Sequence, residues 1–150
     1  MSAARCVLAE EPTVPTLPSL RDNLVKSMIN SIGSRFEYCD RHSRDTAKFH
    51  KFVQVTLKFL AKSYGLRGVT EYGIPNRGDG RGGAIDVVWL NDLNKPVVAI
   101  EIDNANNKSA ISKLTIIPAE LKIWVYYGNP YWMRTPPSNI VVISKRRVYS

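Results

Sequence analysis

The sequence is poor in the side chains that build zinc and disulfide sites. It holds two cysteines, Cys6 and Cys39, and two histidines, His42 and His50. A structural zinc site needs four such ligands in closely spaced pairs, and small disulfide-stapled domains carry more cysteines than two. The sequence therefore predicts a reduced protein without a zinc cluster, in which both thiols are incidental.

Long apolar runs are also absent. No stretch approaches the roughly 20 apolar residues that span a bilayer, and the first residues lack the uncharged hydrophobic segment of a signal peptide. Residues 1–18 hold three prolines without any apolar period, which predicts a flexible leader before a single domain at 19–150. We expect a cytoplasmic protein without a membrane partner.

Negative charge is in short supply. The chain has 13 Asp and Glu against 21 Lys and Arg, a formal net charge of +8. A basic domain is attracted to polyanions, nucleic acid first and anionic membrane second, although many proteins are basic only for solubility. We expect a nucleic-acid partner and leave a homodimer open.

The apolar periodicity predicts an α/β protein. Helices are expected over 19–33, from after the charged segment 37–44 to Gly65, and over 108–117. Strands are expected over 69–73, 84–90, 96–103, 121–127 and 140–143, with a glycine-rich loop at 74–83. The first three strands can form a meander, and we expect the helical crossover to bring the fourth strand beside the first. The result is a mixed sheet flanked by helices.

Most aromatic residues are expected in the core. Trp89, Trp124, Tyr126 and Tyr127 lie in or at the end of apolar strands. Tyr131 and Trp132 lie in a proline-bearing loop and are the better candidates for stacking on bases, although a structural role is favoured even there.

Three acidic residues occupy positions where acids are costly. Asp86 interrupts an apolar strand, Glu101 lies between Ile100 and Ile102 in the most apolar strand, and Asp103 follows on the same face as Glu101. A buried carboxylate is usually paired or bound to a metal. One such acid would indicate an ordinary salt bridge, but three on adjacent strands of a basic chain favour a functional site.

These residues carry a family resemblance. The segment GAIDVVW around Asp86, a turn, the segment VAIEID with Glu101, and a helix with Ser109 and Lys113 resemble the PD-(D/E)xK restriction-endonuclease-like superfamily. The resemblance covers Val69–Tyr127 and the preceding helix. It implies an α-β-β-β-α-β core, here with an extra N-terminal helix. It also implies that the Asp and the Glu hold a divalent ion while a nearby lysine assists the attacking water.

The sequence departs from the family pattern at one position. The family's lysine would stand two residues after Glu101, where this chain has Asp103. Some members carry the lysine on the following helix, so Lys113 is the first candidate for that role and Lys108 the second. Glu71 stands where some relatives place an additional acid. Lys113 could equally be a solvated helix lysine, and for Glu71 a surface charge on an edge strand is slightly favoured.

The resemblance implies a Mg²⁺- or Mn²⁺-dependent nuclease that acts on DNA in preference to RNA. Asp86 and Glu101 would hold the metal with the carbonyl oxygen of Ile102, and Asp103 would be an outer or second-metal ligand. Lys113 would orient the water and offset charge in the transition state. Five basic residues are expected to contact the nucleic acid: Arg77, Arg81, Lys145, Arg146 and Arg147.

Two other interpretations stay open. A non-catalytic nucleic-acid-binding or assembly module could keep this fold without a complete active site, and Asp103 in the lysine position favours it. A partner-binding domain without nucleic acid is the third. Metal-dependent cleavage separates the first from the second, and salt-dependent binding separates both from the third.

Overall fold

The computed structural model describes residues 17–41, 46–105, 108–129, 133–144 and 148–149. Three α-helices lie at Leu17–Arg41 (α1), Thr46–Leu60 (α2) and Lys108–Ile116 (α3), and a 3₁₀ helix, η3, covers Ala61–Tyr64. The strands are β2 (Arg67–Ile74), β3 (Gly83–Leu90), β4 (Pro96–Asp103), β5 (Leu121–Tyr126), β6 (Ile140–Ser144) and β7 (Val148–Tyr149). The predicted α/β class and the α-β-β-β-α-β order are confirmed.

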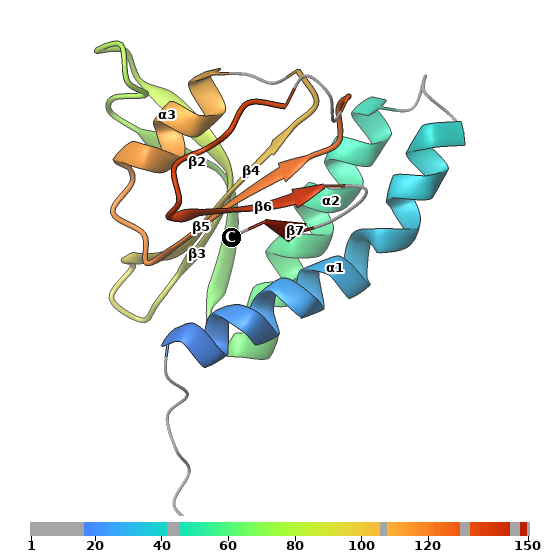
Figure 1. The fold of residues 1–150 in the computed structure, drawn as a ribbon. Helices are drawn as coiled ribbons and strands as arrows, with labels where there is room; N and C mark the ends of the chain where they lie inside the picture. The colour runs from blue at the N-terminus through green and yellow to red at the C-terminus, as the bar shows by residue number, and fades with distance from the viewer. Residues whose placement is uncertain (1–16, 42–45, 106–107, 130–132, 145–147, 150) are drawn as a thin grey trace, which may run out of the picture.

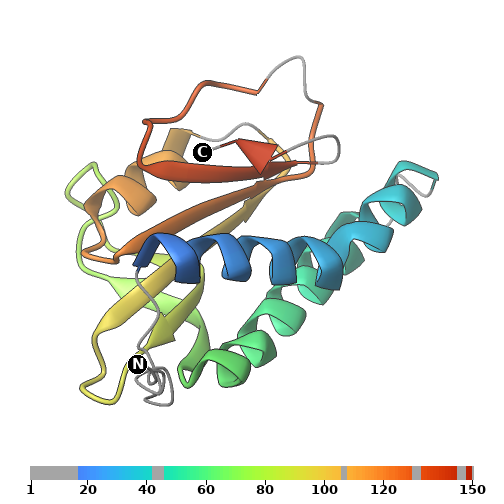
Figure 2. The ribbon, with the colours of Figure 1, turned by 60° about the horizontal axis from the view of Figure 1, so that its bottom comes forward.

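The strands form one mixed sheet between two layers of helices (Figures 1 and 2). The strand order is β2-β3-β4-β5-β6-β7. The meander β2–β3–β4 is antiparallel, β4, β5 and β6 run parallel, and β7 pairs antiparallel with β6. Helices α1 and α2 cover one face, and α3 covers the other. Because β4 and β5 are buried on both faces, their sequences are almost continuously apolar.

Each face of the sheet has its own apolar core. On the α1/α2 face, Val53 and Leu57 of α2 pack against strand residues such as Val87 and Ile100. On the α3 face, Leu114 packs with Trp124 and other strand residues. The four aromatic residues predicted in the core are all buried: Trp89, Trp124, Tyr126 and Tyr127.

The predicted end of the second helix is confirmed at Gly65. This residue has φ 71°, in the left-handed region, and its N–H donates to the carbonyls of Ala61 and Lys62. Glycine adopts this conformation without steric cost, which is why it ends helices. The turn brings the chain directly into β2.

The prediction for the first helix was wrong at both ends. Helix α1 begins at Leu17, inside the predicted leader, and continues through Gly33 to Arg41. A single glycine costs a helix only about 1 kcal/mol relative to alanine, so Gly33 does not end it. The side chains of Leu24, Met28 and Ile32 bury this helix against the core on the α1/α2 face.

The predicted place of the fourth strand was also wrong. β5 lies beside β4, the third strand, and β2 stays at the opposite edge of the sheet. Helix α3 packs over β3, β4 and β5, so the chain leaves it next to the open edge of β4. Strand β7 was not predicted.

Some predictions fall outside the described residues. These are most of the predicted leader, the stacking candidates Tyr131 and Trp132, and the basic segment Lys145, Arg146 and Arg147. No helix in the part of the chain that the structure describes is both long and apolar enough to cross a membrane.

Candidate active site

The candidate site lies where two neighbouring strands stop pairing. The backbone ladder between β3 and β4 runs from Leu90 and Pro96 to Val87 and Ile100. Asp86 and Glu101 are the next residues on the two strands. Backbone groups that lose their ladder partners inside a protein need other hydrogen-bond partners.

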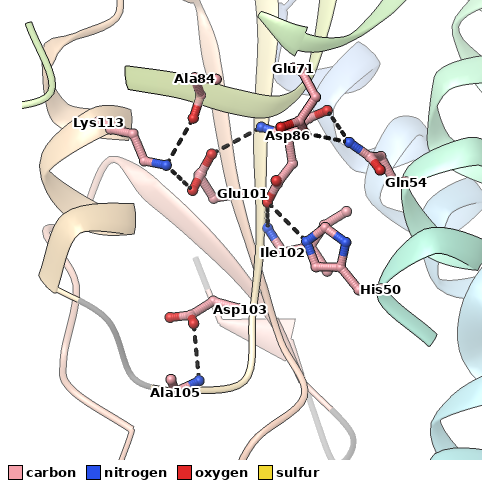
Figure 3. A network of polar contacts seen from close by, with 10 residues as sticks. All are labelled: His50, Gln54, Glu71, Ala84, Asp86, Glu101, Ile102, Asp103, Ala105 and Lys113. Carbon is pink, nitrogen blue, oxygen red and sulfur yellow. Dashed lines mark hydrogen bonds and ion pairs between the residues drawn. The ribbon is translucent and has the colours of Figure 1, made fainter. Parts of the chain in front are cut away.

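The two carboxylates supply these partners across the gap. The N–H of Asp86 donates to Oε1 of Glu101 at 3.0 Å, and the N–H of Ile102 donates to Oδ2 of Asp86 at 2.8 Å. Each acid therefore accepts a main-chain hydrogen bond from the other strand (Figure 3). This exchange holds both side chains near the same point, and the sequence had predicted that they belong to one site.

Lys113 reaches the site from α3. Its Nζ lies 3.0 Å from Oε2 of Glu101 and donates to the carbonyl of Ala84 at 2.8 Å. The Lys113 side chain is 17% exposed and the Glu101 side chain 5%. Of the two candidate lysines, the structure brings Lys113 to the acids. Lys108, at the first residue of α3, is exposed and lines a separate hollow.

Helix α2 contributes two residues that the sequence analysis missed. Nε2 of His50 lies 3.5 Å from Oδ2 of Asp86. The amide of Gln54 donates to Oε2 of Glu71 at 2.7 Å and to the carbonyl of Asp86 at 3.0 Å. Gln54 is 5% exposed and, with Glu101, is one of two polar or charged residues buried in the described chain. These contacts tie α2 to both β2 and β3 (Figure 3).

Glu71 lies at the rim of the site. It stands on β2 between the paired residues Thr70 and Tyr72 and has a positive φ of 52°. A left-handed conformation is uncommon for a glutamate and is costly unless the surroundings hold it. The hydrogen bond from Gln54 is one such restraint. Glu71 is therefore connected to the site through Gln54.

Two groups of the site have shifted pKa values. Burial and the neighbouring Asp86 raise the pKa of Glu101 to about 8, although Lys113 and the N–H of Asp86 act in the opposite direction. The hydrogen bond to Asp86 raises the pKa of His50, against a smaller lowering by burial. Burial is the main cause of the shift in Glu101 and the hydrogen bond to Asp86 that of the shift in His50, and the negative charge of Asp86 adds to both.

The structure does not bring Asp103 to the carboxylate pair. Its Oδ1 accepts the N–H of Ala105 at 3.0 Å, in the turn after β4. Figure 3 shows the side chain apart from Glu101, nearer the end of the strand. Residues two apart on a strand are separated by almost 7 Å. A role of Asp103 as an outer or second-metal ligand therefore stays a prediction, as does the role of the Ile102 carbonyl.

The arginines of the glycine-rich loop are partly engaged. Arg77 forms a two-pronged ion pair with Asp79, which raises the pKa of the arginine and lowers that of the aspartate. Arg81 is exposed, and its main-chain N–H donates to Oδ1 of Asp79. Between this loop and α3 lies an open hollow of about 480 Å³, lined in part by Arg77, Lys108 and Ser112. A phosphate role for Arg77 requires competition with Asp79.

The donor set suits a hard divalent cation better than zinc. Among the described residues, no three His, Cys, Asp or Glu side chains converge into a ready-made metal group. Zinc sites need at least three protein ligands, whereas Mg²⁺ keeps several waters and uses one or two carboxylates. Asp86 and Glu101 offer two carboxylates, and a cation between them would offset both the burial of Glu101 and its repulsion by Asp86, the two causes that raise the pKa of Glu101.

One sequence signal could have found the α2 residues. His50 and Gln54 are four apart, beside the apolar stripe of Phe49, Val53 and Leu57. Residues with this spacing share one side of a helix. A histidine and a glutamine flanking the buried stripe are candidates to face the sheet. The sequence does not say which strand they meet.

Comparisons with known proteins give the chain no family. No family model and no curated protein matches it. Among solved structures, one similar chain belongs to the cryo-EM structure of the DrdV–DNA complex, at a TM-score of 0.47 and 17% sequence identity. The match covers 81% of this chain and 11% of the other, so this chain spans about a ninth of that protein.

Proposed function

We propose that the chain is a divalent-metal-dependent phosphodiesterase that cleaves nucleic acid. The observation that carries this proposal is the meeting of Asp86, Glu101 and Lys113, which come from three different elements. Two carboxylates and one lysine at the end of a strand pair are the groups needed to bind a cation and a phosphate side by side. The net charge of +8 favours a polyanionic substrate.

The metal would be held by Asp86, Glu101 and the carbonyl of Ile102. A bound Mg²⁺ or Mn²⁺ supplies Lewis-acid polarisation of the phosphate and lowers the pKa of a water. Hydrolysis forms a bond from the water oxygen to phosphorus and breaks one ester P–O bond, and a proton passes to the leaving oxygen. The side-chain nitrogen of Lys113 lies beside Glu101, where it can orient the water and offset charge on the phosphoryl oxygens.

His50 and Gln54 have supporting roles in this proposal. Nε2 of His50 lies 3.5 Å from Oδ2 of Asp86, whose side chain is 17% exposed. Gln54 fixes the main chain of Asp86 through its carbonyl. Both contacts orient the carboxylate of Asp86. His50 contacts the carboxylate itself, and Gln54 restrains the main chain that carries it.

The test is cleavage of end-labelled DNA and RNA, single- and double-stranded, with Mg²⁺, Mn²⁺ or EDTA. We expect cleavage only with a divalent ion, and loss of cleavage in Asp86→Asn and Glu101→Gln. Asp92→Asn and Glu120→Gln are matched controls, since both acids are exposed and away from the site. Equal activity in all four variants would assign the cleavage to a contaminant.

The second candidate is a nucleic-acid-binding module without catalysis. Asp103 in place of the family's lysine favours it, together with the lack of a three-ligand metal group among the described residues. This candidate takes the lead if the parent protein binds nucleic acid but leaves every substrate form intact with both metal ions.

A further inference from the structure

The outward side of α2 and η3 carries a line of lysines. Lys51 and Lys62 are exposed and Lys58 is half-buried. Lys51 and Lys58, seven residues apart, share one side of α2, and Lys62 follows about one turn later in η3. At 1.5 Å per residue, the line is roughly 16 Å long. We call Lys51, Lys58 and Lys62 the lysine line.

The lysine line has no acidic residue within its own helical segment. The segment 46–66 contains no Asp or Glu. Within the described residues, no carboxylate forms an ion pair with any of the three lysines. Uncompensated positive charge on one helix side attracts a polyanion, and each phosphate bound there releases counterions.

Apolar side chains are exposed next to the lysine line, on the flank away from His50. Phe59 is 59% exposed and Val55 is 36% exposed, and they are two of the four large hydrophobic side chains exposed in the described chain. The ammonium of Lys58 lies 5.5 Å from the centre of the Phe59 ring. Exposed aromatic rings between cations are the surface on which unpaired bases stack.

The candidate site lies against this helix. The exposed fraction of the side chains falls from 31% in His50 to 17% in Asp86, and Glu101 is 5% exposed. His50 and Gln54, which reach the acids, stand on the neighbouring side of α2 (Figure 3). Lys51 directly follows His50, so a ligand bound along the lysine line would lie beside the α2 residues that contact Asp86.

We propose that the lysine line and Phe59 bind a single-stranded segment of nucleic acid and lead it to the candidate site. This inference rests on the proposed function, because the bound strand would be the substrate that the candidate site cleaves. Phosphates would contact Lys51, Lys58 and Lys62, and an unpaired base would stack on Phe59. A duplex offers phosphates but no free base face for the ring, so the exposed phenylalanine favours the single strand.

An anionic membrane is the rival ligand for a helix with lysines and an exposed phenylalanine. Interfacial helices insert their main apolar face into the lipid. In α2 that face is formed by Phe49, Val53 and Leu57, and it is buried in the core. Val55 and Phe59 alone are left for a bilayer, which favours nucleic acid.

The test is binding of a fluorescent 20-nucleotide single strand and of the corresponding duplex, in EDTA and across a salt series. The double variant Lys51→Gln/Lys62→Gln removes two contacts. We expect its log–log salt slope for the single strand to fall by roughly 1.4, at about 0.7 per phosphate. The matched control Lys26→Gln/Lys95→Gln, also two exposed lysines, should keep the parental slope.

Phe59→Leu tests the stacking contact. Its affinity for the single strand should fall roughly 5- to 100-fold with an unchanged salt slope, while its affinity for the duplex stays the same. The proposal would be overturned if the two double-lysine variants lost the same amount of salt slope. It would also be overturned if Phe59→Leu bound the single strand with parental affinity. A third outcome would also overturn it: the parent binds phosphatidylserine vesicles, and the lysine-line variant loses this binding but binds the oligonucleotide as the parent does.

The proposed function can fail separately from this inference. Asp86→Asn should bind the single strand in EDTA at least as tightly as the parent. If the parent never cleaves but the lysine-line variants lose binding, the binding surface stands without the nuclease. If cleavage is lost in Asp86→Asn but the lysine-line variants bind and cleave single strands like the parent, the nuclease stands and this inference is wrong.

Discussion

Lys113 Nζ lies 3.0 Å from Glu101 Oε2, although one residue belongs to α3 and the other to β4. The lysine stem passes Gly83 and its ammonium also donates to the carbonyl of Ala84 on β3. Lys113 thus joins three elements at the point where β3 and β4 stop pairing. This contact distinguishes Lys113 from the other lysines of this basic chain, because it places the side chain at the carboxylate pair.

Lys113→Ala should leave metal binding in place and slow turnover. The carboxylates stay, so Mn²⁺ affinity should change little, whereas cleavage should drop by roughly 10²-fold or more. Isothermal titration with Mn²⁺ and single-turnover cleavage measure the two effects. Lys108→Ala is the control and should retain nearly full turnover. A larger loss in Lys108→Ala would give the catalytic role to Lys108.

Asp86→Asn and Glu101→Gln should abolish metal binding and preserve the fold. Both changes keep size and polarity, and an amide oxygen can still accept the main-chain hydrogen bonds from the opposite strand. Removing one of two facing charges also removes repulsion, so neither Tm should fall by more than about 4 °C without metal. A large loss of Tm would show that the acids are structural.

Stability without metal should decline as the pH rises. Glu101 has its pKa raised from 4.5 to about 8, so between these values the folded state keeps a proton that the unfolded state has released. The free energy of unfolding then falls by at most about 1.4 kcal/mol per pH unit. Thermal melts from pH 5 to 9 should show this decline in the parent and a smaller one in Glu101→Gln.

Metal should stabilise the protein most at high pH. A cation competes with the proton on Glu101, so Mn²⁺ affinity should increase up to about pH 8 and then level off. The rise in Tm on adding Mn²⁺ should be larger at pH 8.5 than at pH 6.5. A rise that is independent of pH would place the bound ion elsewhere.

Gln54→Glu should destabilise the protein, and more so at high pH. The change replaces an N–H₂ donor with a carboxylate beside Oε2 of Glu71 and the carbonyl of Asp86. Leaving buried acceptors unpaired costs roughly 1–3 kcal/mol, and like charges add to this. The Tm should fall by about 2–4 °C per kcal/mol. In Gln54→Glu/Glu71→Gln, part of that loss should be recovered.

The sequence alone was enough to predict the class of the fold and to single out Asp86 and Glu101 as candidate site residues. Apolar runs, turns and a helix between the third and fourth strands define the α/β order, because these patterns are local. Asp86 and Glu101 could be recognised because each interrupts an apolar strand. A charge inside such a strand is costly, so its presence is informative without coordinates.

Tertiary structure decided the partners of those acids. The period of α2 shows which residues share a side, but packing of the helix on the sheet decides that His50 and Gln54 meet Asp86. The choice of Lys113 over Lys108 depends on how α3 sits over β3, and the place of β5 beside β4 depends on the same helix. These relations are set by contacts between residues distant in sequence, and no local pattern records them.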